Sequence, residues 1–197
     1  GHDYQAAYEE SLFIGRDEGL IHIHAYDDPD VIAGQGSIGV ELMGSGVEFD
    51  AVLMGVGGGG LIGGVAALLK AVRPGVRVIG VQPAGADSMV RSLAAGRVVP
   101  VERAQTIADG LAARRPGAHT LALARRYVDE VRTVSDEQIL SAMRLLLHEE
   151  RLVAEPAGAA GLAAMLGGGA AGIGRAIIIV TGANISDEQF RSVALQP

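Results

Sequence analysis

"MGVGGGGLIGG" (Met54–Gly64) contains seven glycines in eleven residues and lies between two apolar segments. Glycine loses more conformational freedom on folding than any other residue, so this density indicates a place where the backbone itself is needed. The preceding FDAVLMGV (49–56) has the length and continuous apolarity of a parallel strand that is buried on both faces. The following LIGGVAALLKAV (61–72) predicts a helix, and VRVIGVQP (76–83) predicts the next buried strand. This strand–loop–helix–strand unit of about 35 residues has the size of a right-handed crossover.

The remaining segments also alternate between helix and strand patterns. Ser135 with Gln138, and Ser186 with Gln189, have the spacing of capping boxes at helix starts. AGQGSIGVELM (33–43) predicts a loop that leads into a helix. Further helices are predicted at Asp3–Gly15, near Asp87–Ala95, at His119–Tyr127, Ser135–Glu150 and from Glu155, and further strands at Leu20–Tyr26, Glu130–Val134 and Arg175–Gly182. Such alternation indicates an α/β fold of three layers, with a mostly parallel sheet and helices on both faces.

The composition excludes several classes of function. A net charge of −7 argues against a nucleic-acid or anionic-membrane partner, since either would require a basic face. The sequence contains no run of about 18 apolar residues, so no transmembrane helix is predicted. The polar, acidic start does not resemble a signal peptide. The absence of cysteine excludes disulfides, thiolate metal sites and cysteine nucleophiles. A cytoplasmic protein is therefore expected.

Three explanations compete for the glycine loop. Residues 55–60 satisfy the G-x-G-x-x-G pattern of dinucleotide sites, but the next strand ends in Gln82 and Pro83 rather than in the acidic residue that holds a ribose. A phosphate monoester fits better, because consecutive glycines let backbone N–H groups turn inward and the helix beginning near Leu61 adds its positive end. Close packing of helix on sheet, without a ligand, is the third explanation.

Six motifs in order along the chain carry a resemblance. They are DDPDVIAGQGSIGVEL, GVGGGGLIGG, TIADGLAARRPG, VSDEQI, EPAGAAGLAA and VTGANIS, and the resemblance that they carry extends from about residue 3 to residue 190. Together they resemble the threonine/serine dehydratases and serine racemases, pyridoxal 5′-phosphate enzymes with a tryptophan-synthase-β-like fold. The resemblance implies a lyase of amino-acid metabolism that eliminates water from a β-hydroxy amino acid to give a 2-oxo acid and ammonia. It also implies a homo-oligomer, expected to be a dimer.

The resemblance assigns cofactor contacts by position. The residues that it places at the cofactor phosphate are Gly57, Gly58, Gly59, Gly60 and Leu61. Thr181 falls where these enzymes place a hydroxyl or thiol against the pyridine nitrogen; alternatively it is a strand-end residue that bonds its own turn. Glu155 falls near the ring; alternatively it is a helix-start carboxylate favoured by the dipole.

The resemblance also places two segments at the border of the pocket. The first is Gln35-Gly36-Ser37, for which a loop with a helix cap is the alternative. The second is Asp109-Gly110, which would close one side. Many relatives bind a divalent cation near the second strand, where this chain has Gln82, Ala86 and Ser88. Because the carboxylates are missing, no such metal site is predicted.

The catalytic lysine of the resembled family is missing from the sequence. Those enzymes form a Schiff base through a lysine well before the glycine loop, whereas Lys70 is the single lysine here. Lys70 lies about ten residues into the helix after the loop, roughly 15 Å from its start, and is interpreted as a solvated charge. The chain thus resembles a C-terminal fragment, with residues 1–28 from a small domain and 29–197 from the cofactor-binding domain, and is expected to be inactive alone. The alternatives are a serine racemase-like or other β-eliminating pyridoxal-phosphate enzyme and a non-catalytic phosphate-binding α/β module. A NAD-dependent oxidoreductase is a third alternative, against which the non-acidic Gln82 argues.

Overall fold

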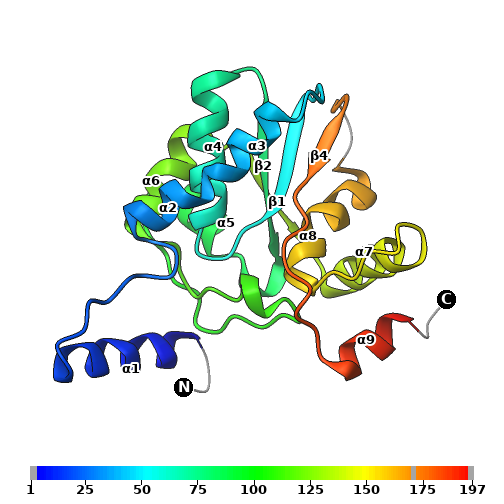
Figure 1. Ribbon diagram of the computed structural model, residues 1–197. Helices are drawn as coiled ribbons and strands as arrows, with labels where there is room; N and C mark the ends of the chain where they lie inside the picture. The colour runs from blue at the N-terminus through cyan, green and yellow to red at the C-terminus, as the bar shows by residue number, and fades with distance from the viewer. Residues whose placement is uncertain (1–3, 170–171, 195–197) are drawn as a thin grey trace.

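The glycine loop follows one of the two central strands of a parallel sheet in the computed structural model, which describes residues 4–169 and 172–194 (Figure 1). The strand order is β3-β2-β1-β4, and every neighbouring pair is parallel. Leu53 of β1 lies opposite Ile79 of β2 and Ile178 of β4. The strands are β1 (Ala51–Gly55), β2 (Arg77–Pro83), β3 (Glu130–Val134) and β4 (Ala176–Ile178).

Side chains of β1 alternate between two hydrophobic cores. Leu53 belongs to the core that contains Ile139, whereas Val52 and Met54 belong to the core that contains Leu69. All five side chains are fully buried. Since both faces of the strand are covered, every position is apolar, which explains the continuous run in the sequence.

Helices cover both faces of the sheet (Figure 1). The side chains of α4, α5 and α6 enter the core that holds Val52, and α2 and α3 pack on α4; these helices are α2 (Pro29–Gln35), α3 (Ser37–Gly44), α4 (Gly60–Val72), α5 (Ser88–Ala95) and α6 (Ala118–Tyr127). The opposite face carries α7 (Asp136–His148) and α8 (Pro156–Ala164), with α9 (Asp187–Ala194) against α7. This arrangement confirms the predicted three-layer α/β class.

Both predicted capping boxes are present. At α7, the Gln138 N–H donates to Ser135 Oγ over 3.3 Å, and the Ser135 N–H donates to Gln138 Oε1 over 2.8 Å. At α9, the Gln189 N–H donates to Ser186 Oγ over 3.1 Å, and the Ser186 N–H donates to Gln189 Oε1 over 3.2 Å. Each box pairs two backbone donors that the start of the helix would otherwise leave unpaired.

The predicted strand at residues 20–26 is wrong. No strand pairs with this segment within residues 4–169 and 172–194, and Ile21 is 92% exposed. Alternating apolar residues form a strand only where a neighbouring strand supplies hydrogen bonds. The segment instead links α1 (Tyr4–Asp17), which has no buried residue and stands apart from the layers in Figure 1, to the rest of the fold. Asp3, where this helix was predicted to begin, lies outside the described residues.

Two other predicted boundaries need correction. Residues 33–43 are two helices, α2 and α3, which meet at Gly36, rather than a loop followed by a helix. The backbones of α2 and α4 approach so closely that a Cβ on Gly64 would overlap the Ile32 carbonyl. This close packing stabilises α2 as a helix, although its glycine has a low helix propensity. The strand predicted over 175–182 is regular only at Ala176–Ile178. In the described ranges, no helix is long and apolar enough to span a membrane.

Candidate functional site

A cavity of about 340 Å³ opens where β1 ends at the glycine loop. The carboxyl edge of a parallel sheet is the usual position of a ligand site in open α/β folds. All seven residues that the sequence assigned to a cofactor line this cavity: Gly57, Gly58, Gly59, Gly60, Leu61, Glu155 and Thr181. Of the two bordering segments, Gln35 and Gly110 also line it, whereas Asp109 faces a separate cavity of about 850 Å³ beside α1.

The glycine loop presents unpaired backbone donors. Within the described chain, the N–H groups of residues 57–61 form no hydrogen bond to a protein acceptor, and the first bond of α4 is from Gly63 N to the Gly59 carbonyl. Gly58, Gly59 and Gly60 are buried, so their unpaired N–H groups would be costly without a partner. A phosphate supplies several anionic acceptors at once, and the positive end of α4 favours it. The loop therefore fits a phosphate monoester.

Three glycines of the loop lie against three different segments. Gly59 has a φ of +98°, and a Cβ there would lie 2.7 Å from Met89 Cε. A Cβ on Gly57 would lie 2.9 Å from the Gly110 carbonyl oxygen, and one on Gly58 would overlap the ring of Tyr26. The absence of side chains thus lets three segments pack onto the loop while its N–H groups stay free.

Tyr26 is a cavity residue that the sequence analysis missed. Its ring packs edge-on against His24 at 4.5 Å between centroids, and its hydroxyl donates to the Arg115 carbonyl over 3.1 Å. Burial raises the pKa of Tyr26 to about 12, so the hydroxyl keeps its proton and remains a donor. From the sequence, Tyr26 was predicted only as the last residue of a strand that ends just before DDPD.

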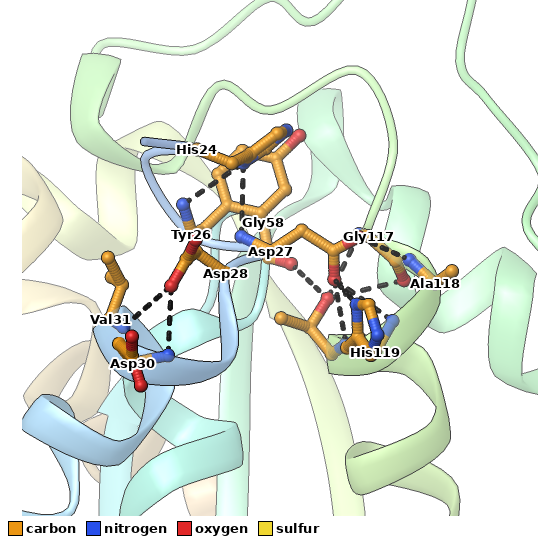
Figure 2. A network of polar contacts seen from close by, with 11 residues as sticks. His24, Tyr26, Asp27, Asp28, Asp30, Val31, Gly58, Gly117, Ala118 and His119 are labelled. Carbon is orange, nitrogen blue, oxygen red and sulfur yellow. Dashed lines mark hydrogen bonds and ion pairs between the residues drawn. The ribbon is translucent and has the colours of Figure 1, made fainter. Parts of the chain in front are cut away.

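The first two aspartates of DDPD, Asp27 and Asp28, cap two different helices (Figure 2). Asp28 Oδ1 accepts from the N–H groups of Asp30 and Val31 at the start of α2. Asp27 reaches across the fold, and its carboxylate accepts from the Ala118, His119 and Thr120 N–H groups at the start of α6. In the sequence this segment is only the start of a family motif, and neither capping role was predicted from it.

Glu155 and Thr181 occupy the wall opposite the glycine loop. Glu155 is the N-cap residue of α8, but its side chain makes no capping bond; Oε2 accepts from the Asn184 N–H over 3.1 Å instead. The Glu155 N–H donates to the Gly182 carbonyl over 3.1 Å. The Thr181 backbone packs directly on Gly158 of α8. Glu155 is thus a carboxylate at a helix start, as the alternative interpretation has it, and its place near a cofactor ring stays a prediction.

Lys70 lies in the last turn of α4, at the end opposite the glycine loop. Its ammonium group contacts Asp129 Oδ2 at 2.7 Å and donates to the Val76 carbonyl over 2.7 Å, and the side chain is only 16% exposed. The interpretation of Lys70 as a solvated charge is wrong, because the side chain ties α4 to the start of β2 and to the residue before β3.

The polar groups of Gln82 and Ser88 bond protein atoms. Gln82 Nε2 donates to the Val56 carbonyl over 3.2 Å, and its Oε1 accepts from the Met89 N–H over 2.9 Å. Ser88 Oγ donates to the Ala113 carbonyl over 3.0 Å. Across the residues that the structure describes, no group of three or more His, Asp or Glu side chains could hold a metal ion. The lack of a metal site stays a prediction.

The stability of the fold is expected to decrease in acid through His24. Its Nδ1 accepts from the Tyr26 and Asp27 N–H groups, which requires an unprotonated nitrogen. Burial, opposed by Asp27, lowers the pKa of His24 below its ordinary value of 6.5. The unfolded chain therefore binds more protons, and the stability that neutral His24 contributes is present above that value and lost as the pH falls below it.

Thermal unfolding of the native chain and of His24→Asn at pH 7.5 and 5.5 tests this expectation. The Asn side chain offers an oxygen acceptor near the position of Nδ1 and does not titrate. The native chain should lose more of its melting temperature in acid than the variant does. An equal loss in both chains would show that His24 does not carry the effect.

The comparisons with known proteins agree with this geometry. A model of the family described as "Pyridoxal-phosphate dependent enzyme" matches residues 1–182. The chain is 43% identical over 185 residues to an L-threonine ammonia-lyase of Thermotoga maritima, covering 94% of this chain and 46% of that protein. It is 42% identical over 151 residues to a catabolic L-threonine dehydratase of Escherichia coli K12, covering 77% and 46%. The chain thus spans about half the length of these curated relatives.

Two solved structures have the same architecture. A threonine deaminase from the organism abbreviated T.th. is 41% identical, with a TM-score of 0.85 over 90% of this chain and 62% of the other. A maize serine racemase is 34% identical, with a TM-score of 0.88 over 94% of this chain and 58% of the other. A threonine deaminase and a serine racemase therefore share the fold that surrounds the cavity.

Proposed function

Because the chain belongs to the family of pyridoxal-phosphate dependent enzymes, we propose that it forms the cofactor-holding part of a threonine/serine dehydratase. Such an enzyme converts a β-hydroxy amino acid into a 2-oxo acid and ammonia. The observation that carries the proposal is the row of unpaired N–H groups at residues 57–61, which share one cavity with Glu155 and Thr181.

The glycine loop is proposed to hold the cofactor phosphate. The N–H groups of residues 57–61 would donate to its oxygens, and the start of α4 would stabilise its charge without a basic side chain. The Tyr26 ring, packed on Gly58, would exclude water from one side of the loop. Gly110, whose carbonyl lies against Gly57, would close another part of the site, and its lack of a side chain lets Ala157 of α8 pack closely against it.

Thr181 and Glu155 are proposed to face the cofactor ring. Bound pyridoxal phosphate acts as an electron sink for the α-carbon of an amino acid. A neutral Thr181 hydroxyl does not hold the ring nitrogen protonated as a carboxylate would, and a weaker electron sink suits elimination of a β-substituent over transamination. The Glu155 carboxylate, held by the Asn184 N–H, would add negative charge at the border of the site.

The catalytic lysine is proposed to come from outside these 197 residues. Lys70, the only lysine, is occupied by Asp129 and the Val76 carbonyl at the far end of α4. Residues 1–28 are proposed to belong to a small domain and 29–197 to the cofactor-binding domain. The exposed α1 and the unpaired apolar segment 20–26 support this division, because both lack the packing found elsewhere in the fold.

The partners proposed for the whole protein are an amino-acid substrate and a second copy of itself, with a cytoplasmic location. Exposed apolar side chains such as Phe13 (66%) and Ile21 (92%) support association with further protein surface. The acidic, cysteine-free composition supports a partner other than nucleic acid and a reducing compartment.

A chimera tests the proposed activity. This chain replaces the matching 185 residues of the Thermotoga maritima L-threonine ammonia-lyase, whose remaining half is expected to supply the Schiff-base lysine that the family resemblance implies. The chimera should bind pyridoxal phosphate and release 2-oxobutanoate and ammonia from L-threonine, measured by a coupled assay. Lys70→Arg in the same chimera should change this rate by less than about twofold, because Lys70 has only a packing role.

The alternatives predict different outcomes for the same chimera. D-serine formation exceeding 2-oxo acid release would favour a racemase, which the similarity to maize serine racemase keeps as the second candidate. Cofactor binding with neither product from threonine or serine would favour a non-catalytic phosphate-binding module. Loss of activity in Lys70→Arg, with cofactor binding retained, would overturn the assignment of the catalytic lysine to another segment.

A further inference from the structure

We infer that Thr120 and Asp27 are positioning residues that aim the glycine loop at the phosphate. The inference rests on the proposed function, because it concerns the same loop. Neither residue lines the cavity. Thr120 instead bonds the loop directly, and Asp27 bonds Thr120. Figure 2 shows Asp27 beside the start of α6.

Thr120 fixes the peptide between Gly58 and Gly59. Its side chain is fully buried, and Oγ1 donates to the Gly58 carbonyl over 2.7 Å while accepting from the Gly117 N–H over 2.9 Å. In a planar trans peptide, the carbonyl and the following N–H point in opposite directions. Holding the Gly58 carbonyl toward buried Thr120 therefore turns the Gly59 N–H away from Thr120, toward the cavity side.

Asp27 in turn fixes Thr120. Its Oδ1 accepts from the His119 N–H over 2.9 Å and from the Thr120 N–H over 3.1 Å, and its Oδ2 accepts from the Ala118 N–H over 2.9 Å. The N-cap residue of α6 is Gly117, which has no side chain to serve as a cap. A carboxylate is stabilised at a helix start, so this bond set anchors the first turn of α6.

Gly117 is separate evidence that Asp27 caps α6. A Cβ on Gly117 would overlap the Asp27 carboxyl group. The N-cap position of α6 thus has no capping side chain of its own. The Asp27 carboxylate, about 90 residues earlier in the sequence, occupies that space and caps the helix. The neighbouring Tyr26 ring packs on Gly58, so the loop is held from two sides.

The test uses the 197-residue chain and two ligands that cannot form a Schiff base. These ligands are 4′-deoxypyridoxine 5′-phosphate and unphosphorylated 4′-deoxypyridoxine, with dissociation constants from titration calorimetry. Thr120→Val removes the hydroxyl at constant shape and leaves the Gly58 carbonyl with only the long bond, 3.5 Å, from the Gly117 N–H. It should weaken binding of the phosphate ester by about tenfold and of the unphosphorylated compound by less than about twofold.

Two further variants separate positioning from general stability. Thr120→Ser keeps the hydroxyl and should bind the phosphate ester within about threefold of the native chain. Asp27→Asn keeps the shape but loses an acceptor oxygen, and should shift the ratio of the two constants in the same direction as Thr120→Val. Circular dichroism and thermal unfolding accompany each titration.

The outcomes distinguish this inference from the proposed function. If the native chain binds the phosphate ester no better than the unphosphorylated compound, the phosphate site itself is absent and both proposals fall. If the native chain prefers the phosphate ester and Thr120→Val keeps that preference, only the positioning role is overturned. An equal loss in Thr120→Val and Thr120→Ser, or an equal loss for both ligands, also overturns it.

Discussion

Gly59→Ala is expected to reduce the affinity of the chain for 4′-deoxypyridoxine 5′-phosphate by about 100-fold or more. Position 59 has a φ of +98°, which an L side chain adopts only with strain. The added Cβ would also lie 2.7 Å from Met89 Cε and 2.9 Å from Thr120 Cβ. The loop must therefore move, and its row of N–H groups would no longer converge on one phosphate.

Gly44→Ala is the matched control for this experiment. Gly44 ends α3, and a Cβ there would have no other heavy atom within 4 Å. The control should bind the phosphate ester as the native chain does. Titration calorimetry on folded samples of both variants gives the comparison. If Gly59→Ala binds as tightly as Gly44→Ala, the loop does not bind phosphate through its backbone.

The sequence predicted the parts of the site that depend on local patterns. The apolar run of β1 and the glycines after it gave the strand, the loop and the helix in their correct order. Ser135 and Ser186 gave two helix starts, since a capping box is complete within four residues. The resemblance then brought Glu155 and Thr181 to the same loop, and both line one cavity with it.

The sequence did not predict the parts that depend on distant partners. Asp27 and Thr120 are 93 positions apart, so neither their hydrogen bond nor the bond from Thr120 to Gly58 has a local signature. The alternating pattern of residues 20–26 shows which side chains are apolar, but it does not show whether a neighbouring strand is available to pair with them. The error at α2 and α3 has the same cause, because close contact with α4 outweighs the low helix propensity of their glycines.

Gly158→Ala is expected to destabilise the fold by about 3 kcal/mol. Gly158 lies in α8, which is buried on almost all sides. A Cβ on Gly158 would overlap the Thr181 carbonyl and approach Thr181 N to 3.2 Å. Both contacts are with backbone atoms, so no rotamer change relieves them. The helix and the segment after β4 would have to separate. Urea denaturation measures the loss, with Gly167→Ala as the control, because a Cβ there would meet only the end of the Gln138 side chain.

The same variant tests the proposed place of Thr181 against the cofactor ring. Gly158 supports Thr181, and the three atoms nearest to an added Cβ all belong to Thr181 rather than to the glycine loop, so the substitution acts first at the Thr181 end of the cavity. Gly158→Ala should weaken binding of 4′-deoxypyridoxine 5′-phosphate while inorganic phosphate binds as in the native chain. That pattern places the ring at Thr181 and the phosphate at residues 57–61. Equal weakening of both ligands would mean that the loop moved with α8, and unchanged binding of both would remove Thr181 from the ring site.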